Sequence, residues 1–296
     1  MQTDIPADPF SISPDWLNAA LPADVLSGAV VTSVDAVNLG EGTGIFGEIA
    51  RLDLGTTGGD GTAPSSVVAK LGWTEPANLE VALALGIYDR ELAFFEEVAP
   101  TTSLRVPTCH ASVRSDDGRF VIVMEDLSGE YEVGDQVAGA SAEQAEAIID
   151  ELAPFHAQWW EHADLASMEW LPVPDAPAYV AAVPNIYAAG VPVLRAEWTD
   201  RVSPEAVQLA IDVEPVFLDL MHRTASGPAT IIHTDTRLDN IFFSRTDPTN
   251  IAFIDFQLAL RGRGVADIAY LLGTSVRREE AAAHWQSLLR RWHEAV

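Results

Sequence analysis

The sequence contains very few residues of two reactive types, lysine and cysteine. Of its 17 basic residues, 16 are arginines, and Lys70 is the one lysine. Cys109 is the one cysteine, so the chain can form neither an internal disulfide nor a metal site built from several thiolates. Lysine carries a compact ammonium charge that the planar guanidinium of arginine does not reproduce. The presence of Lys70 inside the apolar run 67–71 therefore indicates a specific role for it.

Positive charge is scarce as well. The 296 residues include 44 acidic side chains against 17 basic ones, which gives a formal net charge of −27. Such a surface repels the phosphates of nucleic acids and of anionic membranes, so we expect neither as a partner. It favours a cationic substrate, although an acidic surface also serves solubility alone.

Long apolar runs are missing too. No apolar run approaches the roughly 18 residues of a membrane-spanning helix. The N-terminal MQTDIPADPF lacks the basic and apolar parts of a signal peptide. We therefore expect a cytoplasmic protein. A hydrophobic content of 48% is enough for a sizeable core and excludes a disordered chain.

The hydrophobic pattern changes along the chain in a way that predicts two lobes. Strand-like segments occupy 29–54, 66–71 and 119–125, and one helix is expected over 78–98. The remainder is mostly helical in pattern, with long helices expected over the ranges 142–162 and 203–227. We predict an α+β fold with a small, mostly antiparallel β lobe, which contains one key helix, over 1–126 and a larger helical lobe over 127–296.

The first motif with a chemical meaning is a cluster of glycines: Gly40, Gly42, Gly44 and Gly47. The residues that follow alternate as in a strand, whereas a dinucleotide-binding fold would place a helix there. A glycine loop between two strands is typical of the loop that covers the phosphates in kinases, with Ile49 placed to contact adenine. An ordinary glycine-rich hairpin has the same local pattern, so this motif alone leaves both interpretations open.

Lys70 has a candidate partner on the predicted helix 78–98. Glu91 lies on the apolar stripe of this helix, four residues after Ile87 and four before Phe95. A carboxylate on a buried face is costly unless it is paired, so we predict an ion pair between Lys70 and Glu91. Such a pair would hold the ammonium against the α- and β-phosphates of ATP. The alternative is a Glu91 side chain that reaches solvent at the edge of the stripe.

The most specific pattern is a pair of polar segments that follow short apolar strands. His233, Asp235 and Asn240 form the pattern H-x-D-x4-N, and Asp255 ends an apolar strand fifteen residues after Asn240. Phosphoryl transfer needs one carboxylate near the acceptor hydroxyl, and hard oxygen ligands for the Mg²⁺ that bridges the phosphates. We predict the first task for Asp235, the second for Asn240 and Asp255, and a bracing role for His233. A polar turn between strands is the structural alternative.

With these motifs the sequence resembles the aminoglycoside phosphotransferase and choline kinase superfamily, from about Leu39 to Leu272. The segment 255–257 resembles its ecdysteroid-kinase-like branch. The resemblance implies a two-lobed protein-kinase-like fold, ATP as co-substrate and Mg²⁺ as cofactor. It also implies a hinge near 124–128 that binds adenine through backbone groups, with contributions from Met124, Glu125 and Leu127. It further implies that Asp267 is the buried anchor of the catalytic loop.

Two positions depart from the pattern of these families. Thr234 stands where the superfamily usually has glycine, and Gln257 stands where protein kinases have glycine after Asp-Phe. The first substitution leaves the functional side chains in place. The second makes a rearrangement of the kind seen in protein kinases unexpected for this segment.

The spacing between the motifs bears on the acceptor. Eleven residues separate Asp255 from Asp267, too few for the long activation segment on which protein kinases bind peptides. About 105 residues separate the hinge from His233, enough for helices over an acceptor site. We therefore predict a kinase that transfers the γ-phosphoryl group of ATP to a hydroxyl of a small metabolite or xenobiotic, with no protein substrate. Two alternatives stay open, an aminoglycoside-type antibiotic kinase and a nucleotide-binding protein without catalysis.

Overall fold

The computed structural model describes residues 5–39, 47–72, 76–115 and 117–296. Contacts divide the chain into two compact units, Met1–Ala140 with Leu238–Gln257, and Ser141–Arg237 with Leu258–Val296. The chain therefore passes from the first unit to the second, back to the first and again to the second. The predicted boundary near residue 126 concerns functional lobes, which a division by contacts does not test, and it stays a prediction.

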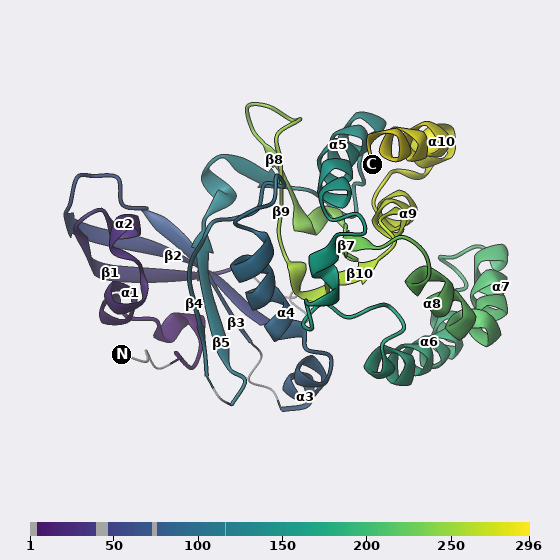
Figure 1. The fold of residues 1–296 in the computed structure, drawn as a ribbon, viewed down its shortest axis with the longest axis horizontal. Helices are drawn as coiled ribbons and strands as arrows, with labels where there is room; N and C mark the ends of the chain where they lie inside the picture. Colours follow the sequence, from purple (N-terminus) through teal and green to yellow (C-terminus); the bar gives the residue numbers. More distant parts are fainter. Residues whose placement is uncertain (1–4, 40–46, 73–75, 116) are drawn as a thin grey trace. The chain divides into compact units, whose positions relative to one another are not determined.

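A five-stranded antiparallel sheet forms the centre of the first unit, in the order β1-β2-β3-β5-β4 (Figure 1). Its strands are β1 (Ala29–Asn38), β2 (Gly47–Gly58), β3 (Ser66–Gly72), β4 (Cys109–Arg114) and β5 (Phe120–Glu125). The strands expected near 29–54, 66–71 and 119–125 are confirmed. β4 was not among the predicted strands.

Two short helices cover one face of this sheet. They are α1 (Pro14–Ala20) and α2 (Ala23–Leu26), preceded by a 3-10 turn at Pro9–Ser11. Leu17 and Leu26 pack in one core cluster with alternate residues of β3: Val67, Ala69 and Leu71. Because side chains alternate across a strand, Lys70 lies on the opposite face of the sheet.

The prediction of one continuous helix over 78–98 is wrong. The structure has α3 (Pro76–Ala84), α4 (Ile87–Ala93) and then a π-helical turn (Phe94–Val98). Gly86, between α3 and α4, has a left-handed φ of 63°, a conformation that glycine adopts without steric cost and that interrupts a helix. Leu83, which a continuous helix would place four residues before Ile87 on the apolar stripe, is 44% exposed.

A second, three-stranded sheet in the first unit has the order β6-β8-β9. Its strands are β6 (Tyr131–Val133), β8 (Ile241–Ser244) and β9 (Ile251–Phe253), and 3-10 turns lie nearby at Leu127–Gly129, Leu238–Asn240 and Phe256–Leu258. β9 confirms the apolar strand that was predicted before Asp255. The turn at Leu238–Asn240 places Asn240 directly before β8.

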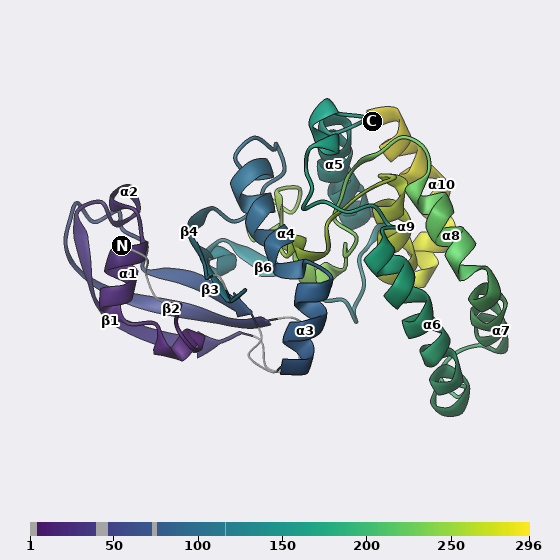
Figure 2. The same ribbon diagram turned by 60° about the horizontal axis from the view of Figure 1, so that its bottom comes forward.

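The second unit is mostly helical (Figure 2). Its elements are α5 (Ala142–Gln158), α6 (Pro177–Glu197), α7 (Pro204–Val213), α8 (Phe217–Ala225), β7 (Thr230–Ile232), β10 (Leu260–Gly262), α9 (Val265–Thr274) and α10 (Arg278–Ala295), with 3-10 turns at Ala163–Ala166 and Glu214–Val216. β7 and β10 form an antiparallel pair. The helix predicted over 203–227 is divided at the turn that contains Pro215, because proline removes a backbone donor and crowds the preceding turn.

The helix α6 corrects the expectation that no apolar segment has the length of a membrane span. It has 21 residues, and its most apolar 18-residue window has a mean hydropathy of 1.3. In the part of the chain that the structure describes, it is the one helix that meets both criteria, and 6% of that window is buried. Length and composition alone are weak evidence for a span. The cytoplasmic location stays a prediction.

Candidate active site

Lys70 lies between two carboxylates of the first unit. Its Nζ atom is 2.8 Å from Glu91 Oε1 and 2.8 Å from Asp255 Oδ1. The three residues come from β3, from α4 and from the segment that follows β9. The predicted ion pair between Lys70 and Glu91 is confirmed. The contact between Lys70 and Asp255 was not predicted. We call these three residues the Lys70 cluster.

The Lys70 cluster is largely closed to solvent. The side chains of Lys70, Glu91 and Asp255 are 10%, 1% and 22% exposed, which excludes a Glu91 that reaches solvent. Burial disfavours the ammonium, but the carboxylates of Asp255 and Glu91 outweigh burial and raise the pKa of Lys70. Burial also raises the pKa of Glu91, and the Lys70 ammonium opposes this shift. When all three groups are ionised, the cluster has an excess of one negative charge.

Asp255 and Asn240 flank the same end of the β8–β9 pair. Ile241 pairs with Phe253, and Ile254 N donates to Asn240 O at 3.0 Å. Asp255 has a left-handed φ of 69°, which is uncommon for a residue other than glycine. Gln257 Nε2 donates to Asp255 Oδ2 at 3.1 Å, so the residue at the protein-kinase glycine position contacts the predicted metal ligand.

Asp267 holds the backbone of the predicted catalytic loop in the second unit. Its carboxylate accepts hydrogen bonds from His233 N and Thr234 N, both at 2.8 Å. Asp267 is fully buried and also contacts His156 Nε2 at 3.2 Å. Trp292 Nε1 donates to His156 Nδ1 at 2.9 Å, so Nδ1 is an acceptor and Nε2 carries the proton toward Asp267. These are the contacts that the predicted anchoring role requires. We call Asp267, His156 and Trp292 the anchor network.

Thr234 has a backbone conformation that favours glycine, the residue expected at this position from the resemblance. Its φ is 66°, in the left-handed region. A threonine pays a steric cost there that glycine avoids. The Thr234 hydroxyl donates to Leu258 O at 2.7 Å, which offsets part of this cost.

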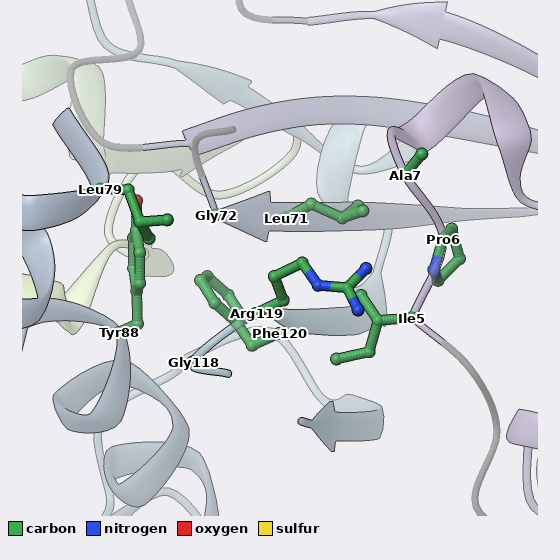
Figure 3. A pocket seen from close by; sticks show the side chains of 10 residues that line it. All are labelled: Ile5, Pro6, Ala7, Leu71, Gly72, Leu79, Tyr88, Gly118, Arg119 and Phe120. Atoms are coloured by element: carbon green, nitrogen blue, oxygen red, sulfur yellow. The ribbon is translucent and has the colours of Figure 1, made fainter. Parts of the chain in front are cut away.

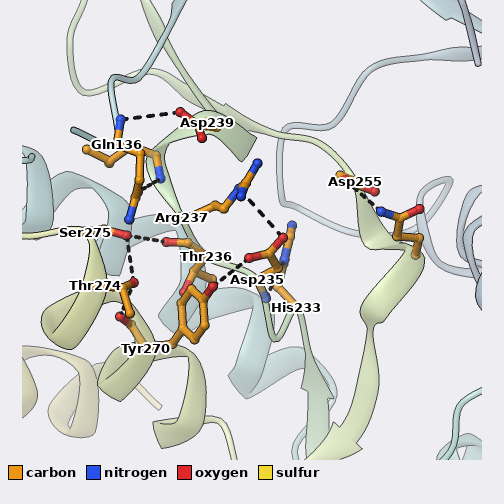
Figure 4. A network of polar contacts seen from close by, with 12 residues as sticks. Gln136, His233, Asp235, Thr236, Arg237, Asp239, Asp255, Tyr270, Thr274 and Ser275 are labelled. Carbon is orange, nitrogen blue, oxygen red and sulfur yellow. Dashed lines mark hydrogen bonds and ion pairs between the residues drawn. The ribbon is translucent and has the colours of Figure 1, made fainter. Parts of the chain in front are cut away.

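Asp235 lies on the anchored loop. Its backbone N donates to His233 Nδ1 at 3.3 Å, and its Oδ1 accepts from the Tyr270 hydroxyl at 2.9 Å. Arg237 Nε lies 4.0 Å from Asp235 Oδ2. Figure 4 shows Tyr270 and Arg237 approaching this carboxylate from different directions. His233 is fully buried and makes a contact suited to bracing, while the catalytic role of Asp235 stays a prediction.

The predicted phosphate loop is described only at its end. Gly40, Gly42 and Gly44 lie outside the described residues, whereas Gly47 begins β2. A Cβ atom on Gly47 would lie 2.6 Å from Leu71 O, so the pairing of β2 with β3 requires glycine at this position. Ile49 pairs in register with Lys70. The nucleotide-binding roles of these residues stay predictions.

The predicted hinge follows directly from β5. Met124 is buried within the sheet, where it pairs with Val68 and Cys109. Glu125 binds Arg105 through its carboxylate, with Nη1 to Oε2 at 3.0 Å, and its backbone N donates to Thr108 O at 2.9 Å. Leu127 is buried in a small cluster with Tyr131 and Ala252. Adenine binding by the backbone of this segment stays a prediction.

A separate small pocket of the first unit involves none of the predicted site residues (Figure 3). Ile5 and Pro6 line it together with Leu71, Tyr88 and Phe120. A Cβ atom on Gly72, which also lines the pocket, would come within 3.0 Å of the rings of Tyr88 and Phe120. Arg119 at its edge forms an ion pair with Asp117 at 2.9 Å. The pocket is therefore mainly a packing feature of the N-terminal segment.

The chain matches the model of a known family over most of its length. Residues 75–295 match the model of the phosphotransferase enzyme family, APH. The chain belongs to this family. Membership confirms the predicted superfamily and the predicted enzyme class, a nucleotide-dependent phosphotransferase with an alcohol acceptor. The ecdysteroid-kinase-like branch stays a prediction. No curated protein matches the chain.

Solved structures share the fold. The GDP and kanamycin complex of APH(2″)-IIIa has a TM-score of 0.51 and 14% identity, over 88% of this chain and 82% of that one. A candidate aminoglycoside phosphotransferase from Ralstonia eutropha has a TM-score of 0.54 and 16% identity, over 95% and 78%. The GDP complex of wild-type aminoglycoside 2′-phosphotransferase-IIIa has a TM-score of 0.52 and 12% identity, over 90% and 82%. At these identities the likeness shows the fold alone, and it confirms the predicted protein-kinase-like α+β class.

Proposed function

We propose that the protein transfers the γ-phosphoryl group of ATP to a hydroxyl of a small metabolite or xenobiotic, with Mg²⁺ as cofactor. The observation that carries this proposal is the Lys70 cluster, in which one ammonium is held 2.8 Å from each of two carboxylates. A point charge fixed in this way suits the phosphates of a nucleotide. Family membership supplies the reaction class, and the cluster supplies a residue for its donor substrate.

Asn240 and Asp255 are the residues that would hold Mg²⁺. Both offer hard oxygen ligands, and they flank one end of the β8–β9 pair. The excess negative charge of the Lys70 cluster also favours a further cation. Among the described residues, no group of three or more His, Cys, Asp and Glu side chains forms a metal site. Mg²⁺ is commonly held by one or two protein ligands together with phosphate oxygens of the substrate. When bound, it would neutralise part of the charge on the phosphates.

The transfer step assigns one task to each functional side chain. Asp235 accepts the proton of the acceptor hydroxyl while the hydroxyl oxygen forms a bond to the γ-phosphorus. The bond between this phosphorus and the β,γ-bridging oxygen breaks, and ADP leaves with the electron pair. Lys70 fixes the α- and β-phosphates, and backbone amides of the loop 40–47 cover the triphosphate.

An aminoglycoside-type antibiotic kinase is the second candidate. The observation in its favour is the net charge of −27, since aminoglycosides are cationic. A nucleotide-binding protein without catalysis is the candidate from another class. The presence of Lys70, Glu91, Asp235, Asn240 and Asp255 in one chain argues against it.

A panel of acceptors tests the proposal. ADP release from ATP and Mg²⁺ is measured with hydroxyl-bearing metabolites and with aminoglycosides as two separate arms. Release that depends on an acceptor supports transfer, and the responding arm decides between the two enzyme candidates. Binding of ATP with no transfer to any acceptor would favour the non-catalytic alternative.

The metal assignment has its own test. We expect ATP to bind more tightly with Mg²⁺ than without it, and Asp255→Asn to remove most of this difference. Calorimetric titration of ATP in the presence and absence of Mg²⁺ measures both. Equal binding under both conditions in the unmodified protein contradicts the metal assignment and leaves the other roles untouched.

A further inference from the structure

The first two turns of α9 make hydrogen bonds to four successive residues of the catalytic loop. Asp267 accepts from the backbone of His233 and Thr234, and its own carbonyl accepts from Thr236 Oγ1 at 3.0 Å. At the other end of α9, Ser275 Oγ donates to Thr236 O at 3.3 Å. These bonds fix the backbone on both sides of Asp235. The side chain of Asp235 is held from the same helix, by Tyr270.

The spacing of Asp267 and Tyr270 explains how one helix reaches both backbone and side chain. The two residues are three apart, so they lie on the same face of α9. Figure 4 shows the Tyr270 ring extending from α9 to the carboxylate of Asp235. The hydroxyl of Tyr270 donates to Asp235 Oδ1 at 2.9 Å, whereas the cationic Arg237 Nε is 4.0 Å from Oδ2. Tyr270 therefore makes the closer of these two contacts.

We propose that Tyr270 is a positioning residue for the general base, and that its hydroxyl holds Asp235 in the one orientation in which the carboxylate meets the acceptor hydroxyl. This inference rests on the proposed function. A base contributes to catalysis only when it lies within hydrogen-bond reach of the proton that it accepts. The side chain of Asp235 has two torsions that must be ordered. The Tyr270 hydroxyl on α9, the helix that already anchors the loop, restricts both torsions before substrate binds.

A neutral donor suits this task. Burial, together with the hydrogen bond to Asp235 and its charge, raises the pKa of Tyr270 to about 12. The phenol therefore keeps its proton throughout the range in which a kinase is assayed. It donates to Asp235 without acting as a second base and without adding a full positive charge beside the carboxylate.

The kinetic test compares two tyrosine variants. Tyr270→Phe removes one hydroxyl and should lower kcat about tenfold, the typical effect of losing a hydrogen bond to a charged group, with the KM for ATP unchanged. Tyr187→Phe is the matched control, since Tyr187 donates to Ala210 O at 2.9 Å within the same unit and makes no contact with Asp235. It should leave kcat unchanged. Equal kcat for Tyr270→Phe and the wild type would overturn the proposal.

A double-mutant cycle separates positioning from general support of the fold. In an Asp235→Ala background there is no carboxylate to orient, so adding Tyr270→Phe should not lower the residual transfer further. A tenfold loss in both backgrounds would mean that Tyr270 acts on something other than Asp235, and would also overturn the proposal. Thermal unfolding and ATP titration of each variant correct the rates for the folded fraction.

A spectroscopic test needs no acceptor and does not depend on the stability of Tyr270→Phe. The chain has five tyrosines, so a protein labelled with ¹³C at tyrosine Cζ gives few resonances. Asp235→Ala should shift the resonance of Tyr270. This resonance is assigned because it is missing from the spectrum of Tyr270→Phe. If that variant does not fold, it is assigned by elimination, with a phenylalanine variant of each of the other four tyrosines. No shift would show that the bond to Asp235 is absent. If the wild type transfers phosphate to no acceptor, the proposed function fails, and this measurement still decides the contact.

Discussion

The Lys70 cluster and the anchor network both bury a carboxylate, but the first stabilises it with an opposite charge and the second with uncharged hydrogen-bond donors. In the cluster, two carboxylates share one ammonium, so charge is left unbalanced when all groups are ionised. In the anchor network, the one carboxylate of Asp267 receives two backbone N–H groups and the N–H of a neutral His156. The first arrangement responds to added charge, whereas the second is satisfied as it stands. The Lys70 cluster is suited to binding a charged ligand, and the anchor network is suited to holding the backbone of the catalytic loop.

This comparison predicts that variants of functional side chains lose transfer while keeping stability, and that variants of the anchor network lose stability. The largest effect is expected for Asp235→Asn. Transfer should fall about 10²- to 10⁴-fold, the usual contribution of a positioned base, with ATP affinity nearly that of the wild type. Single-turnover transfer and calorimetric ATP binding measure the two quantities. Unchanged turnover with the identified acceptor would remove Asp235 from its role.

For Asp267→Asn we expect a loss of about 2 to 4 kcal/mol in the free energy of unfolding. The amide has nearly the shape of the carboxylate, but its NH₂ group would face a backbone N–H of His233 or Thr234 that now lacks an acceptor. Urea unfolding followed by circular dichroism measures this loss. Arg291→Lys offers a control. Arg291 on α10 pairs with Asp150 on α5 at an exposed position, so this variant should change the free energy of unfolding little. A stable Asp267→Asn protein would contradict the comparison.

Lys70→Arg should lower transfer at least tenfold, about 1.4 kcal/mol of transition-state stabilisation, in a protein that still folds. The forked guanidinium is larger than the ammonium that fits within 2.8 Å of both Glu91 and Asp255. Lys70→Ala should lower transfer more, and Glu91→Ala should reproduce part of the loss. The last two changes should not be additive, since both break one interaction. Full activity of Lys70→Arg would refute the assignment.

Chemical labelling sharpens the same prediction. Because Lys70 is the one lysine, an amine-selective acylating analogue of ATP has only this side chain and the N-terminus to modify. Mass spectrometry should show modification of Lys70, and added ATP should protect it. Labelling that does not respond to ATP would place Lys70 away from the nucleotide.

The smallest effects are expected at Thr234. Thr234→Ala keeps the steric cost of the left-handed φ of 66° and loses the hydrogen bond to Leu258 O. It should destabilise the protein by about 1 kcal/mol. Thr234→Gly loses the same bond but relieves the strain, and it should lie within about 0.5 kcal/mol of the wild type. Urea unfolding of both variants gives the strain as their difference. Equal stabilities would show that the backbone at this position is not strained.

Local patterns predicted much of this protein correctly. Short continuous apolar runs indicated β3 and β5, and the position of Glu91 on an apolar stripe indicated its pairing with Lys70. The break at Gly86 was missed because a single glycine is compatible with a helical pattern and interrupts it only when its φ is left-handed. The division of the helix near Pro215 has the same kind of cause, one backbone position that overrides a favourable periodicity.

Tyr270 and Trp292 were missed for a different reason. Each contacts a partner that is distant in sequence, as in the bond between Trp292 and His156, 136 residues apart. The spacing of three between Asp267 and Tyr270 was a signal, because it places both on one helix face. It could be interpreted only after the position of Asp235 beside that face was known.

The sequence by itself determined the residue types and spacings that define the chemistry: one lysine, one H-x-D-x4-N segment and one aspartate after an apolar strand. These follow from composition and from periodicities of a few residues, which act locally. The tertiary structure alone decided which groups share a charge or a hydrogen bond. Lys70 meets Asp255 across 185 residues of chain. Such a contact depends on how β3, α4 and β9 pack, and the energy of that packing is spread over many residues, so no short segment specifies it.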